Sequence, residues 1–328
     1  MNKIAITLFF VMTVFIAADE NSFNTYSLKG LQNYPYKTSP IVIQTMVFKN
    51  ELQYAYNVTY TSMNLTVSAR MSIPAINSEN IKGIVIMLRG HYHTNGYYSG
   101  RGTEVPARYY LSRGWAVIAP DFFGYGTSSP SPSPGELHQF YSTVNAIELY
   151  KSLENPNFRF SQGISQENRA NLGESFKKIG LWGHSNGGQA ALHFLTIIKK
   201  PVPTVLWAPV SLPYPDSWAH YRQNPGWAEY FKSVYNASDF SFLAHLDKIA
   251  PGTPILIDQG DRDTSVPKAW NDAFAGHIAS ENARREKAGI GKINFRYDIY
   301  PGADHSLLPR SNWDTVQKRD VDFWEKNP

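Results

Sequence analysis

The residue best suited to covalent chemistry is Ser185, which lies in the run Gly183-His184-Ser185-Asn186-Gly187-Gly188. The apolar residues before it, 178–182, predict a short buried strand, and residues 187–199 carry apolar side chains at helical spacing. A serine between glycines, on a sharp turn from strand to helix, is typical of a nucleophile because such a turn exposes the hydroxyl group. The Asn186 backbone N–H, in the first turn of the helix, is then expected to face negative charge that develops on a substrate oxygen.

A serine nucleophile needs a histidine as base and a carboxylate that orients this histidine. Two later loops supply such residues, and each loop follows an apolar, strand-like run. The first, after residues 254–260, carries Asp261 and Asp263, and the second, after residues 295–300, carries His305. Because ligands and catalytic groups gather beyond the carboxyl ends of strands in open α/β sheets, the sequence predicts that these loops meet near the serine.

Together these motifs resemble the catalytic domain of the prolyl oligopeptidase family, whose members are serine peptidases. The resemblance extends over residues 80–325 and is carried by Trp182 before the elbow, Gly188 after it, and the Gly-x-x-Asp-x-x-Val pattern of residues 260–266. It implies an α/β-hydrolase fold with a mostly parallel, eight-stranded sheet that is covered by helices on both faces.

The resemblance also implies a role for each candidate residue. Ser185 is the expected nucleophile, Asp263 the acid and His305 the general base, because each occupies the place of that residue in the family's motifs. Asp261 falls outside the pattern and is expected to be a turn or capping residue. His184 is expected to point away from the nucleophile and to be a packed, hydrogen-bonded side chain.

A second oxyanion donor beside Asn186 is expected in the loop after strand 83–88, which continues Arg89-Gly90-His91-Tyr92. Most related hydrolases have His-Gly where this chain has Arg89-Gly90. The family often uses a tyrosine hydroxyl from this loop, but here His91 occupies the aligned place and Tyr92 follows it. The His91 backbone N–H and the Tyr92 hydroxyl therefore stay open as alternative donors.

The amino-terminal residues predict export. Lys3 precedes an apolar core, Ile4 to Ile16, that is shorter than the roughly 20 residues that span a bilayer. Residues 1–18 are therefore expected to be a signal peptide, and the mature protein is expected to be periplasmic or secreted, without a stable membrane anchor. The chain has no cysteine, so it has no disulfide and no thiolate metal site.

The remaining side chains do not favour binding of a metal, a cofactor or a nucleic acid. His91 and His93 form a His-x-His pair, but no further ligand follows at close spacing, so no metal and no cofactor are expected. The net charge is +4 and the basic residues are scattered, so nucleic-acid binding is not predicted. The sequence favours no particular oligomeric state.

The order of the remaining runs predicts a single domain over residues 19–328. Alternating residues at 41–48, 52–60 and 64–73 predict antiparallel strands at one edge of the sheet. Strands follow near 84–88, 115–119, 179–182, 204–208, 255–258 and 295–300, with helices at 103–113, 138–153, 187–199, 269–288 and 313–325. An insertion at 211–250 is rich in aromatic residues, which are expected mainly to pack on the domain and also to form an apolar pocket near the active site.

Two activities are compatible with these expectations, and both proceed through an acyl-enzyme. The first expectation is a serine peptidase of the prolyl oligopeptidase family that acts on small peptides, which the elbow and acid-loop motifs favour, and a carboxylesterase is the alternative. A carboxylesterase with the same triad is favoured by the aromatic insertion and by the short region before the first central strand, which holds too few residues for the β-propeller that family peptidases usually carry. A binding protein that lacks catalysis is disfavoured, because serine, acid and histidine are all present.

Overall fold

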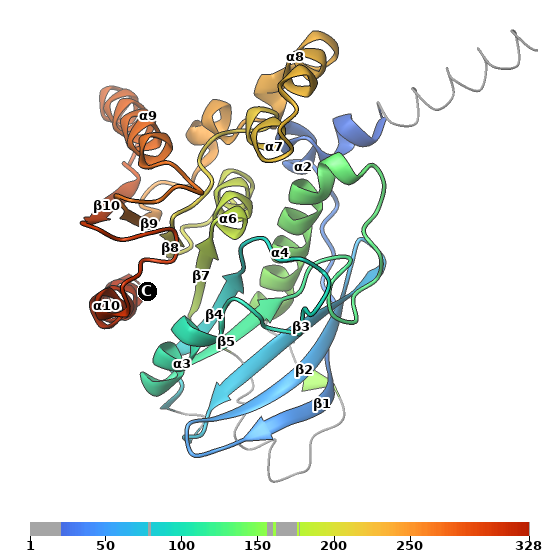
Figure 1. Ribbon diagram of the computed structural model, residues 1–328, viewed down its shortest axis with the longest axis vertical. Coiled ribbons are helices and arrows are strands. Elements are labelled where there is room, and N and C mark those ends of the chain that lie inside the picture. The colour runs from blue at the N-terminus through green and yellow to red at the C-terminus, as the bar shows by residue number, and fades with distance from the viewer. Residues whose placement is uncertain (1–20, 78–79, 156–159, 162–175, 177, 328) are drawn as a thin grey trace, which may run out of the picture.

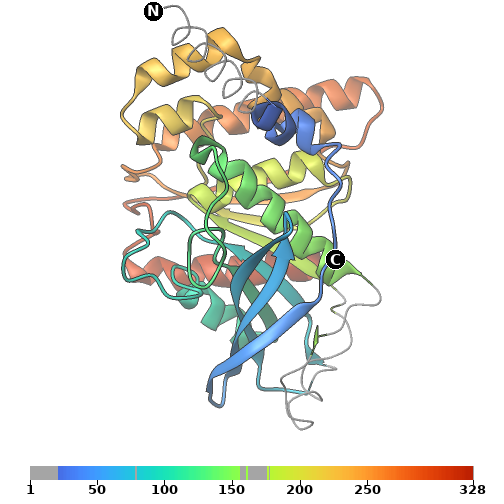
Figure 2. The same cartoon turned by 90° about the vertical axis from the view of Figure 1, so that its right-hand side faces the viewer.

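The computed structural model describes residues 21–77, 80–155, 160–161, 176 and 178–327, so the expected signal peptide lies outside the described residues. The described chain forms one ten-stranded sheet with helices on both faces (Figure 1, Figure 2). The strands lie side by side in the order β10-β9-β8-β7-β4-β5-β3-β2-β1-β6. Their bounds are β1 Ile41–Lys49, β2 Gln53–Ser62, β3 Leu65–Pro74, β4 Gly83–Leu88, β5 Trp115–Pro120, β6 Phe160–Ser161, β7 Ile179–His184, β8 Thr204–Trp207, β9 Pro254–Gly260 and β10 Asn294–Tyr300.

The central strands run parallel and are buried on both faces, which explains why their sequences are almost wholly apolar. All six residues of β4 are buried, and their side chains alternate between two hydrophobic clusters. Ile84 and Ile86 enter the larger cluster, whereas Val85 and Met87 enter the smaller one on the opposite face. The sheet therefore separates two cores that share one set of strands.

The sheet has ten strands instead of the eight that the resemblance implies. β2 and β3 are antiparallel to their neighbours, as expected for an edge, and β1 extends this edge by pairing antiparallel with β2. The two-residue strand β6 then pairs with Ile41 and Val42 at the start of β1. Residues 42–49 pair with β2 across two register shifts, so β1 adds a strand to the eight from β2 to β10.

The helices cover the two faces of the sheet, and the predicted helices match five of them closely. The long helices are α3 Glu104–Ser112, α4 His138–Glu154, α6 Asn186–Ile197, α9 Lys268–Lys287 and α10 Trp313–Lys326. Side chains of α4, α6 and α9 enter the larger cluster, whereas those of α3 and α10 enter the smaller one. The expected α/β-hydrolase fold, with helices on both faces, is confirmed.

The register of the parallel strands brings their carboxyl ends to one edge of the sheet. Leu88 at the end of β4 pairs with Gly183 of β7, and His184 pairs with Trp207 at the end of β8. The ends of β9 and β10 are aligned in the same way through Gly260 and Tyr300. The loops that follow β4, β7, β9 and β10 therefore begin side by side.

The aromatic insertion between β8 and β9 forms α7 Asp216–Tyr221, α8 Pro225–Val234 and the short turns η3 Ala237–Phe240 and η4 Phe242–Lys248. Phe231, Phe240 and Phe242 are fully buried, so packing dominates in this segment, as expected. Phe231 and Phe240 also contact Phe23, which precedes α2 Leu28–Leu31. The insertion therefore fastens the amino-terminal end of the described chain to the face that carries α4 and α6.

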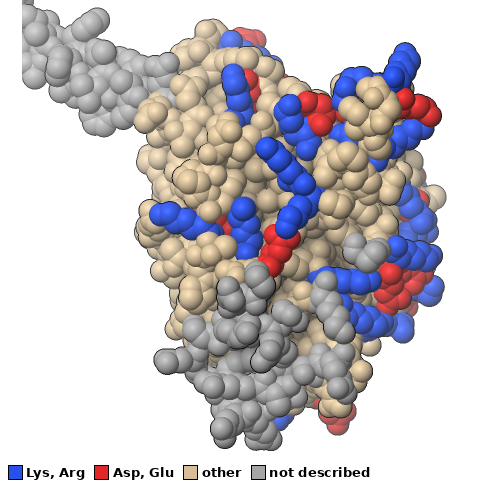
Figure 3. Space-filling view, turned by 180° about the vertical axis from the view of Figure 1, so that it is seen from behind, with Lys and Arg blue, Asp and Glu red and all other residues tan. Residues whose placement is uncertain are grey.

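Charged side chains are dispersed over the surface. On the face shown in Figure 3, lysine and arginine are interspersed with aspartate and glutamate. Among the residues that the structure describes, no helix is long and apolar enough to cross a membrane.

Candidate active site

Ser185 lies on the turn between β7 and α6, and its backbone is strained. Its φ of 55° and ψ of −121° fall in a region that non-glycine residues rarely adopt. Backbone hydrogen bonds hold this geometry, because Ser185 donates its N–H to the Trp207 carbonyl at 3.1 Å and accepts from the Val210 N–H at 3.0 Å. A Cβ on Gly183 would lie 2.7 Å from the Gly187 carbonyl oxygen, so glycine is required where strand and helix cross.

The loop after β4 lies against this turn, at the side where an oxyanion would form. A Cβ on Gly90 would lie 3.1 Å from the Ser185 Cβ, so the Gly90 backbone approaches the serine closely. Among the described residues, no acceptor binds the backbone N–H of His91 or that of Asn186. Two free donors therefore lie near Ser185, one in the β4 loop and one at the positive end of α6.

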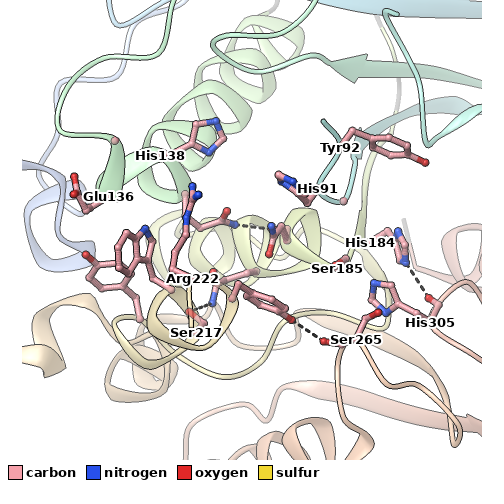
Figure 4. Close-up of a pocket in the computed structure, with 18 of the residues that line it drawn as sticks. His91, Tyr92, Glu136, His138, His184, Ser185, Ser217, Arg222, Ser265 and His305 are labelled. Atoms are coloured by element: carbon pink, nitrogen blue, oxygen red, sulfur yellow. Dashed lines mark hydrogen bonds between the residues drawn. The ribbon is translucent and has the colours of Figure 1, made fainter. Parts of the chain in front are cut away.

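Tyr92 could donate to an oxyanion only if its hydroxyl pointed toward Ser185, and its side chain lies elsewhere. Its ring lies beside Gly102 and below the guanidinium of Arg101, with 5.3 Å between Cζ and the ring centroid. Figure 4 shows the hydroxyl of Tyr92 directed away from Ser185, whereas the ring of His91 lies on the Ser185 side of the loop. The Tyr92 hydroxyl therefore does not point toward Ser185, and the His91 backbone N–H stays a predicted oxyanion donor.

Asp263 and His305 are joined by a short hydrogen bond. The Nδ1 atom of His305 lies 2.8 Å from the Oδ2 atom of Asp263, although 42 residues separate them in sequence. Asp263 also accepts from the backbone N–H groups of Ser265 and Val266, each at 2.8 Å. Burial raises the pKa of Asp263, but the bond from His305 and these N–H groups outweigh it, so the pKa lies below its usual range. The carboxylate is thus ionised where it can hold an imidazole.

Two side chains lie beside this pair, those of Asp261 and His184. Asp261 accepts from the Gly302 N–H at 2.6 Å and so joins two turns, in agreement with the expected turn role. His184 donates from Nε2 to the His305 carbonyl at 3.0 Å, as expected for a packed, hydrogen-bonded side chain. Burial lowers the pKa of His184 to about 4, with the charge of His305 as the next cause, so His184 is neutral and fixes the His305 loop.

Arg89 anchors the loop that carries Gly90 and His91. Its side chain is 4% exposed and donates to the carbonyls of Gly90 and Asp121, at 2.9 and 2.7 Å. The guanidinium also stacks on Tyr125, with 3.9 Å between Cζ and the ring centroid. The sequence shows Arg89 only as a departure from the His-Gly pattern, because two of its contacts are with Asp121 and Tyr125, which lie 32 and more positions away.

Ser185 and His305 open into one cavity of about 670 Å³ (Figure 4). The turn before α4 and the start of α4 supply Glu136 and His138 to its wall, and the α7 segment supplies Trp218, Tyr221 and Arg222. The structure thus places part of the aromatic insertion beside the site. His138 and Arg222 were missed in the sequence, because no local motif signals a residue that converges from a separate element. Burial lowers the pKa of His138 to about 4, with the charge of Arg89 as the next cause.

His91 and His93 do lie together, with 5.6 Å between ring centroids. Within the described part of the chain, however, no three His, Cys, Asp or Glu side chains are grouped so that they could hold a metal ion.

The fold recurs among known structures. An esterase of Pyrococcus furiosus is 19% identical and covers 88% of this chain and 99% of its own, with a TM-score of 0.57. Acetyl xylan esterase 1 of Thermoanaerobacterium sp. JW/SL YS485 is 16% identical and covers 93% of this chain and 94% of its own, with a TM-score of 0.58. A puromycin-hydrolyzing peptidase of Mycobacterium tuberculosis is 16% identical over 85% of this chain but only 40% of its own, also with a TM-score of 0.58.

The comparison with curated proteins finds no match. The model of the alpha/beta hydrolase family matches residues 85–317, which include β4, the Ser185 turn, the Asp263 loop and His305. A match over this much of the chain agrees with the strand order and with the placement of the polar loops at the strand ends. The chain therefore belongs to the alpha/beta hydrolase family and is a hydrolase.

Proposed function

We propose that the protein is a serine hydrolase that cleaves small carboxylic esters through an acyl-enzyme formed on Ser185. The observation that carries the proposal is the 2.8 Å bond between Asp263 and His305, with His305 and Ser185 on the wall of one cavity. Serine, acid and histidine also follow one another along the chain in the order used by α/β-hydrolases.

The roles follow from the chemistry of such a triad. His305 accepts the hydroxyl proton of Ser185 as the serine oxygen bonds to the ester carbonyl carbon, and the carbonyl electrons move to the oxygen. The N–H groups of Asn186 and His91 donate hydrogen bonds to this oxyanion. His305 then protonates the departing alkoxide while Asp263 stabilises the imidazolium. Water then attacks the acyl-enzyme while His305 accepts a proton from it. The bond between the acyl carbon and the Ser185 oxygen breaks and His305 returns the proton to that oxygen, which releases the acid and restores Ser185.

Two features favour small esters over long peptides. The cavity of about 670 Å³ has the size of a small-molecule site. β7, which carries Ser185, pairs with β4 on one side and β8 on the other, so no free strand edge beside the serine is available to an extended peptide.

A second candidate is a peptidase that acts on small peptides. It is favoured by Trp182 and Gly188, which flank the elbow as in the prolyl oligopeptidase family, and by the fold shared with the puromycin-hydrolyzing peptidase. Both candidates use the same triad and differ in the leaving group that His305 protonates.

The test has two stages on one preparation of the full chain. A fluorophosphonate should label the wild type and fail to label Ser185→Ala, and a folded wild type that resists labelling would contradict the serine-hydrolase proposal. The kcat/KM is then measured for short-chain p-nitrophenyl esters and for aminoacyl and peptidyl p-nitroanilides. Turnover confined to the esters supports the first candidate, whereas efficient cleavage of the anilides establishes the peptidase.

A further inference from the structure

Arg222 presents an unpaired positive charge in the cavity that contains Ser185. It is the residue that caps the carboxyl end of α7, and its side chain is exposed on the cavity wall. Among the described residues, no carboxylate or other acceptor binds its guanidinium, which lies only over the ring of Trp218, 5.9 Å from Cζ to the centroid. By contrast, Arg285 and Arg319 each bind a carboxylate of the protein, at 2.7 and 2.8 Å.

Arg222 lines the same cavity as His91 and Ser185. Burial lowers the pKa of His91, and the charges of His93, Arg89 and, as the last cause, Arg222 lower it further. His91 belongs to the loop that lies against Ser185. Arg222 is the sole lysine or arginine among the described residues that line this cavity.

Glu136 is the carboxylate in the same wall, and it lies in the turn before α4. Its charge contributes to the raised pKa of Tyr214, for which burial is the main cause. In the view of Figure 4, Arg222 lies between Glu136 and Ser185. An anionic group held between Ser185 and Arg222 would therefore meet the positive charge before the negative one.

The position of Arg222 also indicates whether it would contact the acyl group or the leaving group of a substrate. Figure 4 shows Arg222 and His305 on opposite sides of Ser185. Because His305 must reach the leaving group to protonate it, the leaving group lies on the His305 side. The acyl group then extends toward Arg222.

We propose that Arg222 binds a negatively charged group on the acyl part of the substrate, so that the preferred substrates are esters or amides of acids that carry a second carboxylate. The inference rests on the proposed function, since it takes acyl-enzyme chemistry at Ser185 as given. A guanidinium suits this task because its N–H groups form paired, charge-assisted hydrogen bonds with a carboxylate.

The experiment compares two p-nitrophenyl esters of similar length, the monoester of adipic acid and the ester of heptanoic acid. The wild type should prefer the anionic ester in kcat/KM. Arg222→Gln should lower the ratio of kcat/KM for the anionic ester to that for the neutral ester by about two- to fivefold, the loss expected for an exposed charge pair. The preference of the wild type should also fall with added salt, because the guanidinium is exposed.

Glu136→Gln is the matched control, since it removes one charge from the same wall. It should leave the ratio unchanged or raise it. A loss of both esters in equal proportion in Arg222→Gln, with unchanged thermal unfolding, would show that Arg222 supports the wall and does not bind the acyl group. Equal ratios in the wild type and in Arg222→Gln would also overturn the inference while leaving the serine-hydrolase proposal intact. If the wild type hydrolyses neither ester and is not labelled by fluorophosphonate, the proposed function itself fails.

Discussion

Asp263 and Asp261 lie two positions apart, yet their hydrogen bonds give them different roles. Asp263 binds the imidazole of His305, whereas Asp261 binds only the backbone of Gly302. We expect Asp263→Asn to lower kcat on a p-nitrophenyl ester by about ten-thousandfold, because an amide cannot hold the histidine in the required tautomer. Asp261→Asn should change kcat by less than about threefold, as expected for a surface position. The reverse pattern would show that the acid was assigned to the wrong aspartate.

A substitution of Arg89 tests whether this residue positions the loop after β4, which carries Gly90 and His91. Arg89→Lys keeps a positive charge but loses the planar fork that reaches the carbonyls of Gly90 and Asp121 together. We expect kcat to fall by about ten- to hundredfold with little change in KM, since a small shift of the loop misplaces the oxyanion donor. The measurement is steady-state kinetics beside thermal unfolding.

Arg101→Lys is the control for this change, because Arg101 lies in the same loop region and donates to the Gly96 carbonyl on the surface. Its kcat should stay near the wild-type value. A rise in KM without loss of kcat in Arg89→Lys would contradict a role in transition-state positioning and would indicate contact with the bound substrate.

At the scale of elements, β9 and α10 are joined by two buried carboxyl groups, Asp258 and Asp320. Asp320 accepts from the Tyr110 hydroxyl at 2.6 Å and from the Trp207 Nε1 at 3.1 Å, and Asp258 accepts from the Tyr300 hydroxyl at 2.7 Å. Each carboxyl group has one oxygen without a hydrogen-bond donor from another side chain. Burial raises the pKa of both, and their mutual proximity raises that of Asp320 further.

These raised pKa values give the sign of a pH effect on stability. The folded state binds protons at this pair that the unfolded state has released, so the free energy of unfolding should fall as pH rises above the usual carboxyl range. Asp320→Asn removes one of the two charges and keeps an acceptor for Tyr110. We expect the urea midpoint of Asp320→Asn minus that of the wild type to be larger at about pH 8 than at about pH 5.

Asp322→Asn serves as the control for the pair, because Asp322 is on the same helix and binds the exposed Lys318. Its urea midpoint should differ from that of wild type by a similar amount at both pH values. If the urea midpoint of Asp320→Asn differs from that of the wild type by the same amount at both pH values, the two buried carboxyl groups do not titrate as a coupled pair.

The elements themselves could largely be predicted from the sequence. The predicted helix 138–153 is one residue shorter than α4, and the predicted strand 84–88 lacks only the first residue of β4, because a buried strand and a long helix have clear apolar patterns. The extra strand β6 could not be predicted. Its two residues form a strand only because the start of β1 provides free hydrogen-bonding groups beside them.

At the scale of the whole molecule, β1 has an outer edge with which no described residue pairs beyond Val42. β6 pairs only with Ile41 and Val42, and farther along β1 the side chains of Met46, Val47 and Phe48 are each more than 40% exposed. An open, apolar edge strand is a template for pairing with another chain. We expect Val47→Lys to reduce association at high protein concentration, as measured by light scattering, without loss of labelling by fluorophosphonate.

Tyr230→Lys is the matched control for this prediction, because Tyr230 is 58% exposed and lies on α8, away from the sheet edge. It should have the smaller effect. If the two substitutions reduce scattering equally, association depends on exposed apolar area in general and not on strand pairing.

The candidate site could be predicted where a residue lies next to a strand end. Ser185, Asp263 and His305 each follow such a strand, and parallel register then brings their loops together. Arg222 and His138 could not be found in this way. They lie on segments that reach the cavity through the packing of the insertion and α4 on the sheet, and that packing leaves no local sequence motif.

The origin of the cavity wall has a consequence for how this protein can change. The groups proposed for bond breaking come from loops fixed to β4, β7, β9 and β10, whereas Trp218, Tyr221 and Arg222 come from an insertion with its own aromatic packing. The two sets of residues are not independent, because the Tyr221 hydroxyl donates to the carbonyl of Ser265, whose N–H binds Asp263. Under the proposal for Arg222, an exchange of the α7–α8 segment would alter the acyl preference, and it would have to retain this contact of Tyr221 to keep the acid loop in place.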